Sequence, residues 1–117
     1  MGVLTYGFGA EYEFDDRILA HLKIVIAVKL RRNESFFLSW TTNPGAGSGR
    51  ISLWLDPAIP LQITFYGSRE PQLNRAWIDV LAELSHSPRG LVLVSEADAE
   101  AVKSGALTLD DLEGLVL

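Results

Sequence analysis

The polar and apolar positions of this chain change period several times, and each change predicts a new element. Between residues 15 and 33, apolar side chains recur at helical spacing (Ile18, Leu19, Leu22, Val25, Ile26 and Leu30). Asp15 is expected to cap the start of this helix, and the basic side chains of its last turn suit the negative end of a helix dipole. We therefore predict a first helix over residues 15–33.

A second helical period begins near Pro71, a residue that fits the first turn of a helix, and continues to about Ser85. Its apolar positions form the most regular stripe in the chain (Leu73, Ala76, Trp77, Val80, Leu81 and Leu84). The pattern predicts a second helix that packs through this stripe.

The remaining apolar segments are short, alternate with polar residues and are bounded by turn residues, which is typical of strands. Residues 3–14 predict two strands joined around Gly7, Phe8 and Gly9. Further strands are expected at 35–42, 50–55, 61–66 and 91–94. The links between the three middle strands are short and rich in turn residues, so these strands are expected to be antiparallel neighbours.

The predicted order is ββαβββαβ followed by a tail, which indicates an α+β fold with two helices packed on one face of a mostly antiparallel sheet. We expect one domain over residues 1–95 and an acidic, leucine-rich tail over 96–117. In the tail, Ser95 could cap one short helix, and Thr108 with Asp111 resembles the capping box of another. The tail's leucines either dock on the body of the protein or contact another chain.

Phased together, the three middle strands have one continuous apolar side, which the helices should cover (Phe36, Leu38, Trp40, Ile51, Leu53, Leu55, Leu61, Ile63 and Phe65). The opposite side carries one large ring per strand among small polar side chains: Phe37, Trp54 and Tyr66. One interpretation is a platform on which bases or sugars stack while Arg50 or Arg69 meets phosphate. The other is an ordinary sheet face that is covered by the tail, the N-terminal hairpin or a second subunit.

The first helix has a second face, in which basic residues surround two aliphatic ones (Arg17, His21, Ile24, Val28, Arg31 and Arg32). This face could contact a partner or a nucleic-acid backbone. Alternatively, the leucines and acidic residues of the tail could cover it, since their charges match.

Composition narrows the class of protein. Hydrophobic residues make up 48% of the 117 residues, which indicates a folded globular chain with one core. The chain has no cysteine, signal-peptide pattern or membrane-length apolar run, so we expect a cytoplasmic protein. The net charge of −5 comes from residues 91–117, because acidic and basic residues balance over residues 1–90. The body could therefore still meet an anionic partner.

No side-chain pattern supports an active site, so we expect no catalytic residue, cofactor or metal. Lys29 lies within the apolar stripe of the first helix; a buried lysine can serve as a catalytic amine, but in a last turn it more often extends to water. Two histidines do not make a typical zinc site. The other candidates have simpler explanations as turns or helix ends (Ser85-His86-Ser87, Asp15-Asp16, Asp110-Asp111 and "GAGSG" at 45–49).

Several stretches carry a family resemblance: "DDRILAHLKIVIAVKLRR", "SFFLSW", "SLWLDPAIPLQITFYGS" and "LNRAWIDVLAELSHSPRGLVLV". Over residues 1–95 the chain resembles an uncharacterised family of roughly 100-residue actinobacterial proteins that begin M-G-x-L-x-Y-G. Many members are labelled "ATP-dependent DNA ligase". The lysines of this chain do not stand in the K-x-D-G motif that a ligase needs to take up AMP, so the resemblance transfers no catalytic residue.

These observations favour a non-catalytic binding or accessory module. It would touch nucleic acid, in DNA repair or ligation as the family label suggests, through six residues: Phe37, Trp54, Tyr66, Arg31, Arg32 and Arg50. The alternative is a homo-oligomer or a partner-docking protein that uses the same aromatic face together with the tail. A ligase or other enzyme is the third and least supported hypothesis.

Overall fold

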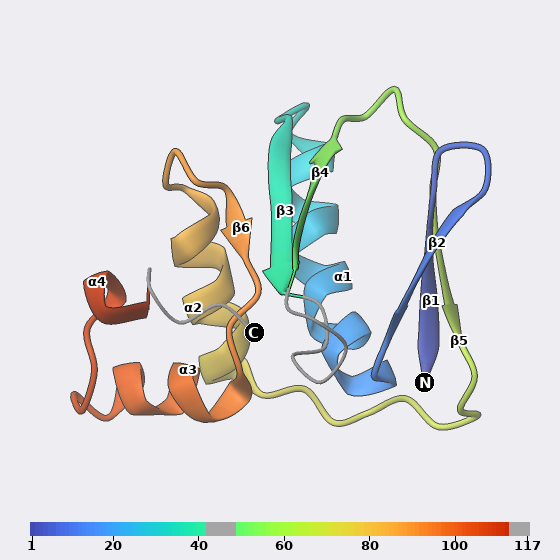
Figure 1. Cartoon of the computed structure of the whole chain (residues 1–117). Helices are drawn as coiled ribbons and strands as arrows, with labels where there is room; N and C mark the ends of the chain where they lie inside the picture. Colours follow the sequence, from blue (N-terminus) through green and yellow to red (C-terminus); the bar gives the residue numbers. More distant parts are fainter. Residues whose placement is uncertain (42–48, 113–117) are drawn as a thin grey trace. The chain divides into compact units, whose positions relative to one another are not determined.

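The computed structural model describes residues 1–41 and 49–112 of the chain. Its elements follow in the order β1 (Gly2–Tyr6), β2 (Ala10–Phe14), α1 (Asp16–Arg31), β3 (Phe36–Thr41), β4 (Arg50–Leu55), β5 (Leu61–Phe65), α2 (Arg75–Ser85), β6 (Leu91–Val92), α3 (Glu96–Lys103) and α4 (Leu109–Leu112) (Figure 1). The predicted α+β class, element order and helical tail are confirmed.

The strands form two sheets, of order β2-β1-β5 and β4-β3-β6. The expectation that the three middle strands are neighbours in one sheet is therefore wrong, because β5 pairs with β1 instead of β4. Alternation of apolar residues specifies which side of a strand is buried, but it does not specify the neighbouring strand. The chain correspondingly divides into two compact units, Met1–Ser35 with Asp56–Asn74 and Phe36–Leu55 with Arg75–Leu117.

In the first unit, β1 is the central strand and pairs antiparallel with both β2 and β5. The β1–β2 turn passes through Gly7 and Gly9, both at positive φ, a conformation that glycine adopts without strain. α1 packs against β1 and β5 and contributes fully buried Leu19 and Leu22 to the core. As predicted, Asp15 caps α1: its side chain accepts a hydrogen bond of 3.3 Å from the Arg17 N–H.

In the second unit, β3 is the central strand, antiparallel to β4 and parallel to β6. β6 begins directly after Gly90, which has φ +81 and whose missing Cβ would lie 2.4 Å from the Phe37 carbonyl oxygen. Only a residue without a side chain permits this approach, so Gly90 allows β6 to pair with β3. α2 packs beside β6, and the Trp77 Nε1–H donates to the Val94 carbonyl at 2.9 Å.

α2 begins at Arg75, four residues later than the expected start at Pro71. The backbone just before Arg75 is engaged elsewhere: the Gln72 carbonyl accepts from Arg17, and the Asn74 N–H donates to His21. These bonds to α1 hold residues 71–74 outside the helix, although their apolar spacing continues the stripe.

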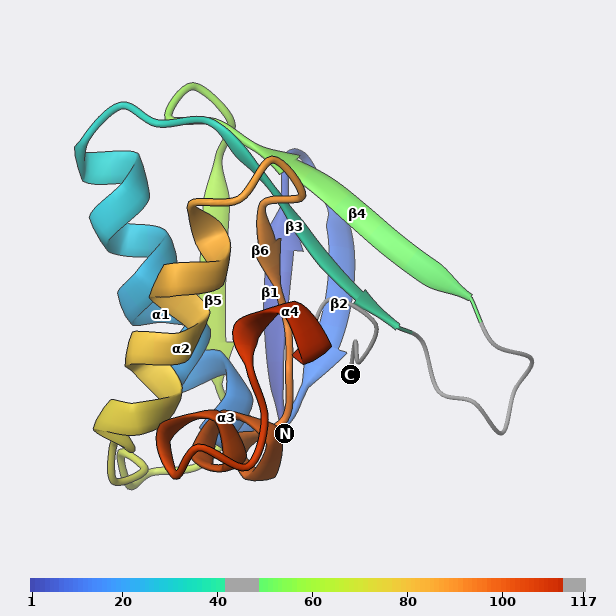
Figure 2. The ribbon, with the colours of Figure 1, turned by 90° about the vertical axis from the view of Figure 1, so that its left-hand side faces the viewer.

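The tail helices α3 and α4 start as the sequence predicts. The Ser95 hydroxyl accepts from the Asp98 N–H at 3.1 Å, and Thr108 and Asp111 exchange the two bonds of a capping box. α3 lies across the N-terminal end of α2 in both views of the ribbon (Figures 1 and 2). The last leucines, for which docking or partner contact was expected, lie outside the described residues (Leu115 and Leu117).

The turn between β4 and β5 is organised by Asp56. Its carboxylate accepts a short hydrogen bond from the Ser35 hydroxyl and a second, 2.8 Å bond from the Ala58 N–H. Both bonds favour the charged form, the Ser35 bond most strongly, so they hold the pKa of the Asp56 carboxyl below its ordinary value.

We expect Trp77→Phe to lower the free energy of unfolding by about 1–3 kcal/mol, because it replaces the buried indole with a smaller phenyl ring and leaves the Val94 carbonyl without the indole donor. Equilibrium urea denaturation measures the change. Tyr66→Phe is the control: Tyr66 is 64% exposed, so the loss should stay within about 0.5 kcal/mol. Equal losses in the two variants would contradict this account.

Ser35→Ala should raise the pKa of Asp56 towards its ordinary value, because the larger of the two stabilising bonds is lost. A depressed carboxyl pKa stabilises the fold above the unfolded value of about 3.9, and this contribution disappears as pH falls through the folded value. The stability difference between wild type and variant should therefore be present at neutral pH and vanish in acid. NMR titration of the Asp56 carboxyl carbon reads the pKa directly. Ser104→Ala is the control: it removes a hydroxyl bonded to the Ala101 carbonyl and should leave the pKa of Asp56 unchanged.

Candidate functional site

The outer face of β3 and β4 carries two of the predicted rings. Phe37 and Trp54 are direct cross-strand partners, with ring centroids 5.1 Å apart and an edge-to-face angle of 67°. They are 44% and 46% exposed, whereas Leu38 and Leu53 on the opposite side are buried. The prediction of which side of these two strands is buried is thus confirmed. The two rings hold one another in a defined geometry.

Two more cross-strand pairs continue this face along the same two strands, which lie side by side in both ribbon views (Figures 1 and 2). The hydroxyls of Ser39 and Ser52 are hydrogen-bonded at 2.8 Å, and beyond them Thr41 lies opposite Arg50. We call these six residues the aromatic strip (Phe37, Ser39, Thr41, Arg50, Ser52 and Trp54). The strip offers ring surface, hydroxyls and one guanidinium, which suits contact and hydrogen bonding but not catalysis.

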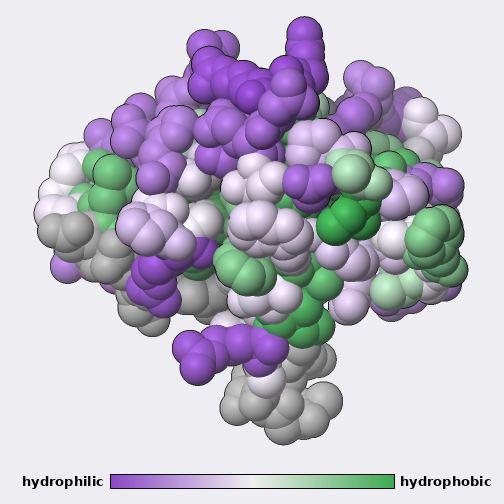
Figure 3. Space-filling view, turned by 90° about the horizontal axis from the view of Figure 1, so that it is seen from above, coloured by the Kyte–Doolittle hydropathy of each residue, from purple (hydrophilic) through white to green (hydrophobic). Residues whose placement is uncertain are grey.

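The other predicted site residues belong to the first unit. Tyr66 follows β5 and is 64% exposed, but β5 belongs to the other sheet, so the expected three-ring platform on one sheet is wrong. Arg31 and Arg32 are exposed at the C-terminal end of α1. Figure 3 views the structure from the end at which α1 terminates, and hydrophilic residues cover large parts of that surface. Of the three predicted arginines, the strip itself contains only Arg50.

The loop of residues 67–74 is bonded to α1 at three points. The Gly67 N–H donates to Asp16 at 2.9 Å, the Arg17 guanidinium donates to the Gln72 carbonyl at 2.6 Å, and the Asn74 N–H donates to His21 at 2.8 Å. All three contacts come from side chains in the first half of α1. A segment without regular secondary structure is thereby held in one conformation.

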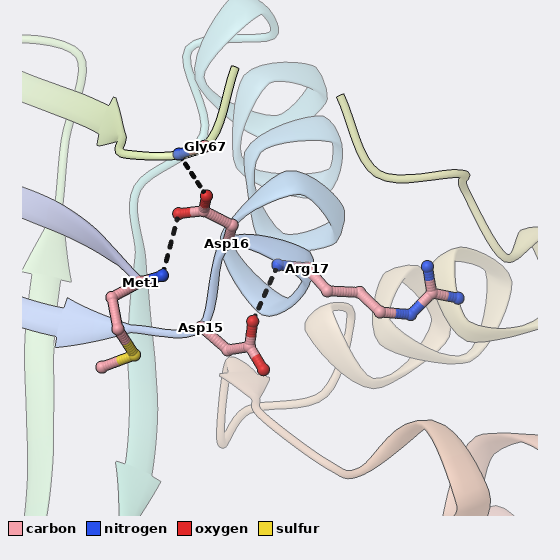
Figure 4. Close-up of polar contacts among 5 residues, drawn as sticks. All are labelled: Met1, Asp15, Asp16, Arg17 and Gly67. Atoms are coloured by element: carbon pink, nitrogen blue, oxygen red, sulfur yellow. Dashed lines mark hydrogen bonds and ion pairs between the residues drawn. The ribbon is translucent and has the colours of Figure 1, made fainter. Parts of the chain in front are cut away.

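Asp16 lies at the first of these points, between two parts of the chain (Figure 4). One carboxylate oxygen accepts from Gly67, and the other is 3.7 Å from the ammonium of Met1, while Asp15 turns to the Arg17 N–H. A Cβ on Gly67 would be 2.9 Å from the Asp16 carboxylate, so a larger residue at this position would require the Asp16 side chain to shift. The paired carboxylates start the helix, as predicted, and Asp16 also ties the loop to it.

His21 forms the third point and is fully buried, although the sequence placed it on the second, mixed face of α1. The loop reaches this face at His21, while Val28, Arg31 and Arg32 of the same face remain exposed. Because the Asn74 N–H can only donate, the His21 Nε2 must accept, and the hydrogen on Nδ1 is donated to the Arg17 carbonyl at 2.7 Å. The histidine thereby links α1 to the loop. The sequence contains no local signal for this role.

A groove of about 370 Å³ lies between α1 and the loop; we call it the loop groove. Its lining includes apolar Ile24, Phe65 and Leu73 and charged Lys23, Arg69 and Glu70. The Lys23 ammonium lies 5.8 Å from the centroid of the Phe65 ring, within range of a cation–π contact. The sequence suggested Arg69 only as a phosphate contact. It did not predict the groove, because the residues that line the groove come from two distant parts of the chain.

Lys29 lies on the buried stripe of α1, as predicted, and is only 6% exposed. Its ammonium is 3.6 Å from the Glu34 carboxylate, beyond the end of the helix. The structure thus places a compensating charge beside the lysine, where the sequence suggested extension into water.

The described residues, 1–41 and 49–112, contain no group of three or more histidine, cysteine or acidic side chains that could hold a metal ion. Within the same part of the chain, no helix combines the length and apolar character needed to cross a bilayer. The "GAGSG" segment, interpreted above as a turn, lies mostly outside the described residues.

Residues 1–96 match a protein family described as a domain of unknown function, DUF7882. The match covers most of the chain, so the chain belongs to this family. This finding agrees with the expected membership of an uncharacterised family. Comparisons with curated proteins and with solved structures find no match.

His21→Phe should lower the free energy of unfolding by about 1–3 kcal/mol. The phenyl ring can fill the space of the imidazole, but the Asn74 N–H loses its hydrogen-bond acceptor. Amide exchange at Asn74 should also become faster relative to the core of α1, since the loop is released at this point. His86→Phe alters the exposed histidine and should change stability by no more than about 0.5 kcal/mol. An unchanged Asn74 exchange rate in His21→Phe would contradict a linking role for the imidazole.

Proposed function

We propose that this member of the DUF7882 family is a non-catalytic binding module whose contact surface is the aromatic strip. The observation that carries the proposal is the exposed, edge-to-face pair of Phe37 and Trp54 on the neighbouring strands β3 and β4. Large aromatic side chains contribute strongly to interface energy when a partner covers them. Cross-strand packing already orients these two rings, so little conformational entropy would be lost on binding.

The charges near the strip favour a protein partner over nucleic acid. Arg50 is the only basic residue of the strip, and the second unit has twice as many acidic as basic residues. Affinity for a phosphate backbone depends on several cations acting together. The rings could stack on bases and Arg50 could meet one phosphate, so single-stranded DNA is the competing ligand.

The partner that best complements the strip is a second copy of the same strip. Arg50 and Trp54 lie towards opposite ends of β4. If two strips face each other across a two-fold axis, the guanidinium of one copy can lie over the indole of the other, twice in the same interface. The hydroxyl pairs of Ser39 and Ser52 then meet near the axis. We therefore propose a homodimer formed through the aromatic strip.

Sedimentation equilibrium tests this proposal on the full chain. Wild type should show a concentration-dependent monomer–dimer equilibrium, and Trp54→Thr should shift it at least about tenfold towards monomer, a loss typical of an interface hot spot. Threonine is polar but retains strand propensity, so the circular dichroism spectrum should be unchanged. Tyr66→Thr removes an exposed ring outside the strip and should dimerise like wild type. A monomer at all concentrations would overturn the proposal.

A parallel titration with labelled oligodeoxythymidine separates the nucleic-acid hypothesis from self-association. Weak or no binding at low salt is expected. Salt-dependent binding that Trp54→Thr and Arg50→Gln both weaken, by a chain that sediments as a monomer, would assign the strip to nucleic acid instead. Incubation with labelled ATP should leave no covalent AMP on the protein; an adduct would overturn the non-catalytic assignment.

A further inference from the structure

The loop groove has the size and lining of a small-molecule site, and it lies wholly in the first unit, to which no residue of the aromatic strip belongs. Its volume of about 370 Å³ falls in the lower part of the range of roughly 300–1,000 Å³ that is usual for ligand pockets. We propose that this groove binds a small organic carboxylate with a flat apolar body.

The apolar part of the lining accounts for the body of the ligand. Phe65, Ile24 and Leu73 come from the end of β5, from α1 and from the loop, so they surround the groove from three segments. Leu73 is 54% exposed although it is a large aliphatic residue. A bound apolar group would remove this surface from water, which is the main source of affinity in such pockets.

The charged part of the lining accounts for the carboxylate. Lys23 and Arg69 contribute two positive charges and Glu70 one negative charge, so the charged side chains of the groove leave a single net positive charge. A monoanion matches this balance, whereas a dianion would have to tolerate Glu70 without a further cation. The planar guanidinium of Arg69 can bind both oxygens of a carboxylate. Lys23, above the Phe65 ring, places its charge where the apolar and polar parts of the ligand would join.

The groove is preorganised by the bonds between α1 and the loop. Gly67, Gln72 and Asn74 are each fixed to a side chain of α1, and Arg69 and Leu73 lie between these points. A ligand would not have to order the loop as it binds, and avoiding this entropic cost favours affinity. The same bonds explain why a surface loop can offer a defined cavity.

Titration of the isotope-labelled full chain with 3-phenylpropionate, followed by proton–nitrogen NMR, tests the site. Saturable shifts are expected at the amides of Gly67, Ser68 and Leu73. The neutral analogue 3-phenylpropionamide has the same body without the charge, and it should bind at least about fivefold more weakly, since the charge-assisted bonds are lost. No saturable shift with the carboxylate, or equal binding of the amide, would overturn the proposal.

Two substitutions separate the charged from the apolar contribution. Arg69→Gln should weaken the carboxylate several-fold but leave the amide analogue unaffected, and Leu73→Ser should weaken both. Arg32→Gln removes an exposed cation of the same unit outside the groove and should change neither. If Arg32→Gln weakens binding as much as Arg69→Gln, the attraction is a general charge effect and the proposed site is wrong.

The result does not depend on self-association through the aromatic strip. Trp54→Thr should bind 3-phenylpropionate like wild type, whatever its oligomeric state. If instead the groove amides shift with protein concentration in the absence of ligand, a second copy occupies the groove, and the small-molecule assignment is overturned.

Discussion

The attachment of loop 67–74 to the first half of α1 is the contact on which the loop groove and the start of α2 depend. Asp16, Arg17 and His21 each satisfy a backbone group of a segment that has no regular secondary structure of its own. The Asn74 bond is partly buried, and a buried backbone group left unpaired costs about as much as a lost hydrogen bond. The bonds of Gly67 and Gln72 are exposed to water and fix the course of the loop. Side chains of α1 therefore supply hydrogen-bond partners to the backbone of this loop, as neighbouring strands do for the backbones of β1 and β5.

Polar contacts also hold the residues at which the chain leaves or enters the first unit. It leaves the first unit after Ser35, returns at Asp56 and leaves again after Asn74. Ser35 and Asp56 are hydrogen-bonded to each other, and Asn74 is bonded to His21. Each of these residues is thus held by a polar contact inside the first unit, and α2 can begin only where the last contact ends.

The two proposed surfaces differ in shape and chemistry because one is formed by paired strands and the other by a loop held against a helix. The aromatic strip is made by strand register, which places Phe37 against Trp54 and Ser39 against Ser52 on a regular surface. Regular, extended surfaces suit another protein surface. The loop groove is made by an irregular segment held against a helix, and the concavity it encloses suits a small ligand.

Local patterns in the sequence were sufficient for the features that depend on neighbours along the chain. The caps at Asp15, Ser95 and Thr108 follow from side chains that reach backbone groups within a few residues, and alternation places Phe37 and Trp54 on the outer face. Only the tertiary structure decided which strand pairs with β5, where α2 begins and why His21 is buried. These depend on contacts between segments some 50 residues apart, and hydrophobic periodicity carries no information about which distant partner a segment meets.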